Sequence, residues 1–106
     1  MAEELKRLVL CGKKTATAGL YEEGQRLPRA GEHARILDTN KNPFCVIQYI
    51  AIDVKNLLDV EFSFAKKEGE GDKNIHEWRE KFKDFFGLER DDVKVVCEEF
   101  KLVELV

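Results

Sequence analysis

The segment from residue 44 to residue 53, FCVIQYIAID, limits most strongly what this chain can fold into. Its β-branched and aromatic residues predict a strand, in which successive side chains point to opposite faces. One face would carry Cys45, Ile47, Tyr49 and Ala51, and the other Val46, Gln48, Ile50 and Ile52. Both sets are largely apolar, so both faces of this strand need to be covered. We therefore expect it to be a central strand of a small closed barrel.

The rest of the chain divides into short helices and strands. Helices are expected over residues 2–11, 59–67 and 75–86. Strands are expected over residues 15–20, 33–39 and 93–105. The last of these can also be two segments that are separated near Glu98 and Glu99. The turn NKNP joins residues 33–39 to residues 44–53 as a hairpin in which Asn tolerates positive φ. Together these elements predict an α+β fold, with mostly antiparallel strands in a small barrel or strongly curved sheet and about three flanking helices.

The helix over residues 75–86 has the clearest pattern. Asn74 can cap its start and Gly87 can end it. Its apolar stripe consists of Ile75, Trp78, Phe82, Phe85 and Phe86. Trp78 within such a stripe is either a core residue, which we favour, or a platform on which a base stacks.

Size and charge exclude several classes of protein. At 106 residues the chain fits one domain, residues 1–106, and no segment reaches the roughly 18 to 20 apolar residues of a membrane span. The net charge of −3 gives no overall attraction for polyanions, so we predict no DNA partner. The first residues do not resemble a secretory signal, which predicts a cytoplasmic protein.

We expect Cys11, Cys45 and Cys97 to be reduced core residues.

The stretch GKKTAT, residues 12–17, is the first candidate for chemistry. Gly12 can end the first helix, which leaves two interpretations of the residues that follow. In one, Lys13 and Lys14 stabilise the helix C-terminus through its dipole, while the threonines simply begin a strand. In the other, the Lys14 ammonium hydrogen-bonds the Thr17 hydroxyl or a phosphate.

The loop EGEGD, residues 68–72, is the second candidate. Its carboxylates, on Glu68, Glu70 and Asp72, repel one another, which suits either proton transfer through a raised pKa or the binding of a hard cation. The loop lacks the glycine and the downstream glutamate of a calcium loop, since Lys73 and Arg79 occupy those positions. We therefore predict no metal site, and the remaining alternative is a solvated, charged turn.

Taken in order, these motifs resemble the ASCH domain family over nearly the whole chain. Gly12, Lys14 and Thr17 match the G-x-K-x-x-T signature of that family. The stretch LPRAGEHARILD is similar to its LP-x-x-G-[DE] motif, and AKKEGEGD followed by EWREKFKDFF is similar to its acidic loop and aromatic helix. The resemblance implies a β-barrel related to the PUA domain and an association with RNA. Phe82 stands where the family's helix usually carries histidine, and Gly19 stands where one branch carries arginine.

Two branches of the family suggest different reactions. One branch removes the acetyl group from acetylcytidine with a lysine, a threonine and a glutamate, which match Lys14, Thr17 and Glu68. The other branch, which this chain resembles more closely, includes proteins that cleave single-stranded RNA. By this resemblance we expect RNA or a modified nucleoside as partner and no metal or cofactor. Further substrate contacts are expected from Lys13, Arg26, Arg29, Glu70 and Arg79.

These considerations leave two classes of function. The first is a metal-independent hydrolase, either a ribonuclease or an acetylcytidine-type amidohydrolase. In the amidohydrolase, Thr17 attacks the amide carbonyl, Lys14 assists, and Glu68 passes a proton to the leaving amine. The second class is a non-catalytic module that binds RNA or another protein.

Overall fold

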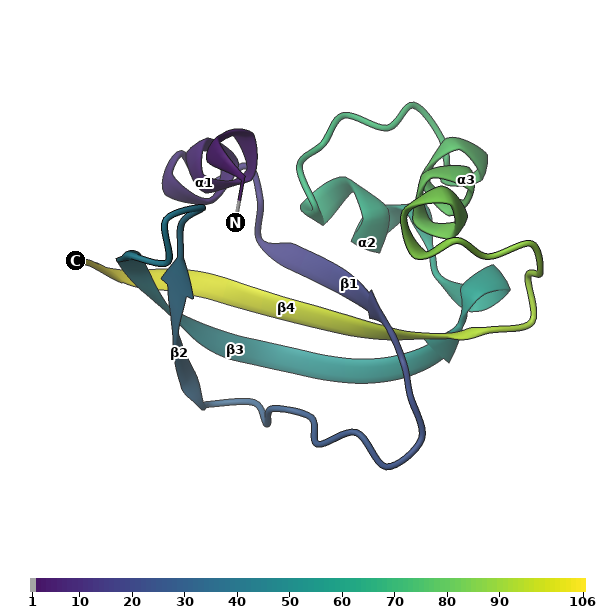
Figure 1. Ribbon diagram of the computed structural model, residues 1–106, viewed down its shortest axis with the longest axis horizontal. Helices are drawn as coiled ribbons and strands as arrows, with labels where there is room; N and C mark the ends of the chain where they lie inside the picture. Colours follow the sequence, from purple (N-terminus) through teal and green to yellow (C-terminus); the bar gives the residue numbers. More distant parts are fainter. Residues whose placement is uncertain (1) are drawn as a thin grey trace.

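A curled antiparallel sheet of four strands organises the molecule (Figure 1). The computed structural model describes residues 2–106. The strands lie in the order β1 (Ala16–Leu20), β4 (Lys94–Leu105), β3 (Pro43–Asn56) and β2 (His33–Leu37). The helices are α1 (Glu3–Leu10), α2 (Phe62–Lys67) and α3 (Ile75–Phe86), with a 3-10 turn at Leu57–Asp59. The predicted α+β fold is confirmed, and the sheet is a half-barrel rather than a closed one.

Most of the expected elements are present, with local differences. The strand β4 is continuous, so the optional break near Glu98 and Glu99 does not occur. Strands β2 and β3 form the predicted hairpin, but positive φ in its turn falls on Lys41 rather than on an asparagine. The predicted helix over residues 59–67 begins only at Phe62, because the preceding residues form the 3-10 turn and an extended Val60.

A bulge at Ile50 corrects the predicted faces of β3. Tyr49 pairs with Phe100, whereas Ala51 pairs with Glu99, so one extra residue stands on β3. Because neighbouring residues of β4 point to opposite faces, Tyr49 and Ala51 also lie on opposite faces. The prediction that both share a face is therefore wrong, since strict alternation fails at a bulge.

This sheet carries an apolar cluster on each face. One cluster joins the sheet to α2 and α3 and contains Leu57, Val60, Ala65, Trp78, Phe82, Val95 and Cys97. The other joins the sheet to α1 and contains Val9, Phe44, Cys45, Ile47 and Phe100. Cys97 and Phe100 are three residues apart on one strand, which places the two clusters on opposite faces. The expectation that both faces of the central strand β3 are covered is wrong over its second half, because Ile50 is 54% and Val54 40% exposed and no residue of β3 belongs to the cluster under α2 and α3.

Helix α3 has the predicted ends but an incomplete apolar stripe. The Asn74 side chain accepts a hydrogen bond from the Glu77 amide, and Gly87 adopts φ 66° at the C-terminal end. Trp78 and Phe82 are buried, with ring centroids 5.5 Å apart. Phe85 is 83% exposed, so its placement in the core was wrong. Its ring contacts Phe86 edge-on, with centroids 4.9 Å apart, and otherwise faces outward.

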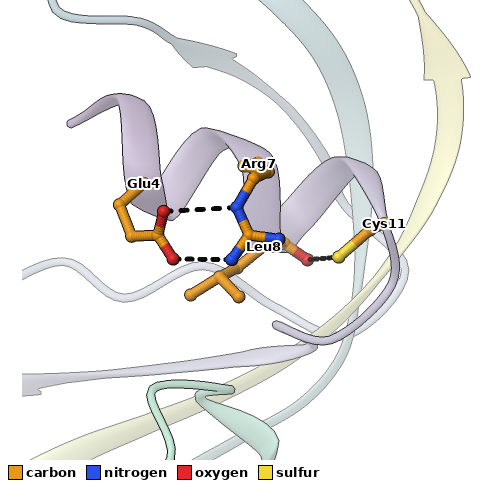
Figure 2. A network of polar contacts seen from close by, with 4 residues as sticks. All are labelled: Glu4, Arg7, Leu8 and Cys11. Atoms are coloured by element: carbon orange, nitrogen blue, oxygen red, sulfur yellow. Dashed lines mark hydrogen bonds and ion pairs between the residues drawn. The ribbon is translucent and has the colours of Figure 1, made fainter.

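Helix α1 is held by local contacts that Figure 2 shows. Arg7 donates from Nε and Nη2 to the two carboxylate oxygens of Glu4, and the Cys11 thiol lies 3.6 Å from the Leu8 carbonyl oxygen. Cys11 is exposed, because it follows the last turn of the helix, so its assignment to the core was wrong. Cys45 and Cys97 are free and buried as predicted, and burial raises the pKa of the Cys97 thiol to about 11.

In the part of the chain that the structure describes, no helix is both long and apolar enough to cross a membrane.

Candidate functional site

Two oppositely charged side chains are buried together where β1 begins. Lys14 is 3% exposed and Glu68 is 8% exposed, and the Lys14 Nζ lies 3.7 Å from a Glu68 carboxylate oxygen. Lys14 also donates to the Ala16 carbonyl oxygen at 2.7 Å. Glu68 accepts a short hydrogen bond from the Trp78 indole nitrogen. Each charge therefore has a second polar partner, as buried charges require.

The backbone brings these two residues together. The amides of Lys13 and Lys14 both bond to the Leu8 carbonyl, which turns the chain sharply after α1. The Thr15 amide then donates to the Lys67 carbonyl at 2.7 Å, joining the start of β1 to the end of α2. The interpretation of Lys14 as a lysine that only stabilises the helix end is wrong, because this turn directs its side chain inward.

Gly69 permits the close approach between the loop after α2 and the segment that precedes β1. It has φ +77°, and a Cβ added there would lie 2.5 Å from the Lys13 carbonyl oxygen. Real Cβ atoms do not tolerate such a contact, so only glycine lets the two segments pack this closely. Gly69 directly follows Glu68 and therefore helps to fix the position of the carboxylate.

Burial changes the acidity of both charged groups. Loss of hydration lowers the pKa of Lys14, although Glu68 and Glu70 act in the opposite direction. Loss of hydration also raises the pKa of Glu68, against the Trp78 hydrogen bond and the Lys14 charge. Both shifts favour the neutral forms, so a proton can leave Lys14 or be held on Glu68 more easily than in water. This is the behaviour expected of an acid and base pair.

A cavity of about 230 Å³ opens beside this pair. Its polar lining comes from Lys14, Thr17, Glu68, Glu70, Asp72 and Lys81. Its apolar lining comes from Leu5, Ala18, Trp78, Phe82, Phe85 and Phe86. The lining therefore combines charged groups with aromatic rings, which suits a small ligand that has a flat ring and a polar substituent.

The predicted site residues separate into two groups. Lys14, Thr17, Glu68 and Glu70 all line the cavity, although the last two lie some fifty residues from the first two. Lys13, Arg26 and Arg29 are exposed or partly exposed, and none of them lines it. Arg79 faces the Leu57–Asp59 turn, where it donates to the carbonyl oxygens of Leu58 and Val60.

Sequence reasoning missed three contributors to the cavity. Asp72 was noted only as a loop carboxylate, yet its side chain is buried and pairs with the Lys81 Nζ at 2.7 Å. Nothing in the sequence distinguishes Lys81 from other helix lysines, because its partner lies in a different element. Phe85 was assigned to the core, and its helical spacing could not show that it lies at the cavity instead.

Within residues 2–106, no group of three His, Cys, Asp or Glu side chains is placed to hold a metal ion.

A curled antiparallel sheet with a helix-covered face and a cavity beside β1 defines a PUA-like α+β domain. The ASCH domain model matches residues 1–104, and the chain belongs to that family. No curated protein matches it.

Solved structures agree with this assignment. The chain is similar to an ASCH domain from Lactobacillus crispatus, with 30% identity and a TM-score of 0.83 over 95% of this chain and 71% of that one. It is also similar to protein EF3133 from Enterococcus faecalis, with 31% identity and a TM-score of 0.77 over 97% of this chain and 72% of that one. A Zymomonas mobilis ASCH protein shares the fold at 16% identity, with a TM-score of 0.66 over 100% of this chain and 70% of that one.

The close approach at Gly69 predicts that an alanine substitution costs more stability at Gly69 than at Gly71. Gly71 also has positive φ, +81°, but an added Cβ there meets nothing within 4 Å. Gly71→Ala should therefore lower the free energy of unfolding by about 1–2 kcal/mol, the cost of left-handed backbone. Gly69→Ala adds overpacking, for a total loss of roughly 2–4 kcal/mol. Urea denaturation measures both, and equal losses would contradict the proposed contact.

The raised pKa of Glu68 can be followed through Trp78. Because Trp78 is the single tryptophan of the chain and bonds to Glu68, its fluorescence should titrate with a midpoint above 4.5, the ordinary glutamate value. The folded state holds this proton more tightly than the unfolded state. The stabilisation from Glu68 is thus complete at low pH and is lost as pH rises through the raised pKa.

Two variants test this assignment. Glu68→Gln should abolish the fluorescence transition, whereas Glu89→Gln, which removes an exposed glutamate, should retain it. A midpoint at or below 4.5 in the unmodified protein would show that burial does not dominate the pKa of Glu68.

Proposed function

We propose that the cavity binds one modified nucleobase and hydrolyses an amide on it, of the kind found in an acylated cytidine. The observation that carries this proposal is the buried Lys14–Glu68 pair, 3.7 Å apart, beside a cavity that Thr17 also lines. The pKa of the lysine is lowered and that of the glutamate is raised, which are the directions that general base and general acid catalysis need.

The reaction can be written with these three residues. The Thr17 hydroxyl oxygen attacks the amide carbonyl carbon while neutral Lys14 takes the hydroxyl proton. The resulting ammonium is close enough to stabilise charge on the carbonyl oxygen. The carbon–nitrogen bond then breaks as Glu68 supplies a proton to the leaving amine. Water then attacks the acyl carbon and gives one proton to Glu68, and the bond to the Thr17 oxygen breaks as Lys14 returns its proton to that oxygen, which releases the acid and restores all three residues.

The charges of the cavity favour a neutral substrate over a phosphodiester. With Lys14 and Glu68 both neutral, as the mechanism requires, the charged groups left in the lining are the carboxylates of Glu70 and Asp72 and the ammonium of Lys81. A phosphate placed among them would be repelled by the surplus of negative charge. Amide hydrolysis is therefore better supported than ribonuclease action at this cavity, although the motifs of the chain resemble the RNA-cleaving branch more closely.

The aromatic residues of the lining supply recognition of a base. Phe85 is 83% exposed at the cavity, and its ring meets Phe86 edge-on at 4.9 Å. An exposed aromatic face held in this way is suited to stacking on a planar base. The small volume, about 230 Å³, is below the roughly 300–1,000 Å³ of pockets for drug-sized ligands and so suits a single base.

Removing the Lys14 amine should stop turnover. We expect Lys14→Ala and the more space-filling Lys14→Met to lower kcat for acetylcytidine by at least about a hundredfold, because general base catalysis contributes roughly 10²–10⁴-fold. Lys101→Ala, which removes an exposed lysine of β4, should retain full activity. Mass spectrometry of the released cytidine, with EDTA present, measures the effect.

Circular dichroism of each variant verifies that the fold is intact. Equal turnover by Lys14→Ala and the unmodified protein would refute the mechanism. Absence of turnover by the unmodified protein, with binding of acetylcytidine retained, would leave a non-catalytic recognition module. Cleavage of single-stranded RNA that depends on Lys14 would instead establish the ribonuclease.

Loss of the Phe85 ring should weaken substrate binding rather than chemistry. Stacking of a base on an aromatic ring contributes about 1–3 kcal/mol, so Phe85→Ala should raise KM for acetylcytidine roughly five- to hundredfold with little change in kcat. Leu58→Ala is the matched control, because Leu58 is 56% exposed and lies outside the cavity. An unchanged KM in Phe85→Ala would show that the base does not reach this ring.

A further inference from the structure

One charged lysine of the cavity has no part in the proposed reaction. Lys81 lines the cavity from α3, and its Nζ lies 2.7 Å from Oδ1 of Asp72, which belongs to the loop between α2 and α3 (Figure 1). The Asp72 side chain is only 4% exposed, and a buried carboxylate needs a partner of opposite charge. The pairing therefore holds the Lys81 ammonium at the wall of the cavity, although the lysine side chain itself is 57% exposed.

The position of Lys81 on α3 places it between the proposed chemistry and the exposed aromatic ring. Residues three or four positions apart are neighbours on one side of a helix, so Lys81 lies between Trp78 and Phe85. All three line the cavity. Trp78 donates to the Glu68 carboxylate, whereas Phe85 is the ring on which the base is proposed to stack. A base that stacks on Phe85 with its amide at Glu68 therefore has an edge near Lys81.

Lys81 keeps its charge while the proposed general base is neutral. The pairing with Asp72 raises the pKa of Lys81, whereas burial lowers the pKa of Lys14. When Lys14 is neutral, Lys81 supplies the one ammonium among the described residues that line the cavity. An ammonium has three donors, and Asp72 at 2.7 Å and Glu77 at 3.7 Å leave at least one of them for a ligand. Such a donor selects a hydrogen-bond acceptor on the part of the ligand that faces it.

We propose that Lys81 selects the ring of the substrate, by donating a hydrogen bond to a ring acceptor on the edge beside the acylated amine. In an acylated cytosine these acceptors are N3 and the O2 carbonyl oxygen, and an acylated aniline has neither. Asp72 acts through Lys81 as a positioning residue. The substrate class is then amides of rings that carry such acceptors, rather than aromatic amides in general. This inference rests on the proposed amide hydrolysis and names the part of the substrate that the cavity recognises.

Two amides separate this contact from stacking and from chemistry. Acetylcytosine and acetanilide both carry an acetylated amine on a flat six-membered ring, but only acetylcytosine has acceptors on that ring. The preference is the ratio of kcat/KM for acetylcytosine to that for acetanilide. Comparing this ratio between variants cancels the different intrinsic reactivities of the two amides. Calorimetry of cytosine, the product, measures the same contact without any turnover.

The variants are chosen to keep the fold intact. Lys81→Met removes the donors and keeps the length of the side chain, but it leaves the buried Asp72 carboxylate unpaired, which destabilises a fold. The double variant Asp72→Asn/Lys81→Met removes both charges and avoids that cost. Lys83→Met is the matched control, because Lys83 lies on the same helix, pairs with Asp91 at 2.9 Å and does not line the cavity. Thermal unfolding of each variant verifies the fold.

Both Lys81 variants should lower kcat/KM for acetylcytosine roughly tenfold or more, because hydrogen bonds to charged groups are among the stronger ones. Turnover of acetanilide should change little, and Lys83→Met should change neither. Asp72→Asn alone should lower the preference. The double variant should lose no more preference than Lys81→Met, since Asp72 acts through Lys81 and the two effects do not add. The affinity for cytosine should fall in parallel.

Equal losses for acetylcytosine and acetanilide in the double variant would overturn the inference, as would a double variant that behaves like Lys83→Met. This inference and the proposed hydrolysis can fail separately. Turnover of acetylcytosine with an unchanged preference in the double variant rejects only the role of Lys81. Binding of cytosine that depends on Lys81, without turnover of either amide, rejects only the hydrolysis. Absence of both binding and turnover in the unmodified protein rejects both.

Discussion

Removing Lys14 and Glu68 from water is costly, and much of the surrounding structure serves to offset that cost. Each charge meets the other at 3.7 Å and a further polar partner, the Ala16 carbonyl or the Trp78 indole. A buried pair of this kind adds little net stability, because desolvation opposes the attraction between the charges. Its place at the wall of a cavity and the shifts of both pKa values toward the neutral forms are consistent with the hydrolysis proposed above.

The two apolar clusters lie on different faces of one sheet, and one of them also borders the cavity. The face covered by α2 and α3 holds Trp78 and Phe82, which also form the wall of the cavity. The face covered by α1 holds Phe44 and Phe100 in a separate apolar cluster. Membership of the ASCH domain family accounts for this plan, while the site itself has to be argued from its own residues, because one fold supports many functions.

Local patterns in the sequence predicted the features whose causes are local. The Asn74 cap, the Gly87 stop and the hairpin of β2 and β3 all depend on residues within a few positions of one another. The family resemblance supplied the grouping of Lys14 with Glu68, which spacing alone could not. The exposed positions of Phe85 and Cys11 and the pairing of Asp72 with Lys81 were not predictable, because burial and partners depend on elements that are distant in the sequence.

The bulge at Ile50 has a consequence for how such a chain can change over evolution. Because the bulge reverses the facing of β3, Ile47 and Tyr49 pack on the cluster under α1, whereas Ala51 and Asp53 lie on the same face as Cys97 of the other cluster. Leu5 of α1 also lines the cavity, but Trp78 and Phe82 of its aromatic wall belong to the cluster on the other face from Phe44 and Phe100. Changes in well-separated groups of residues usually add independently. Substitutions at Trp78 or Phe82 can therefore alter the wall of the cavity without touching the cluster that contains Phe44 and Phe100.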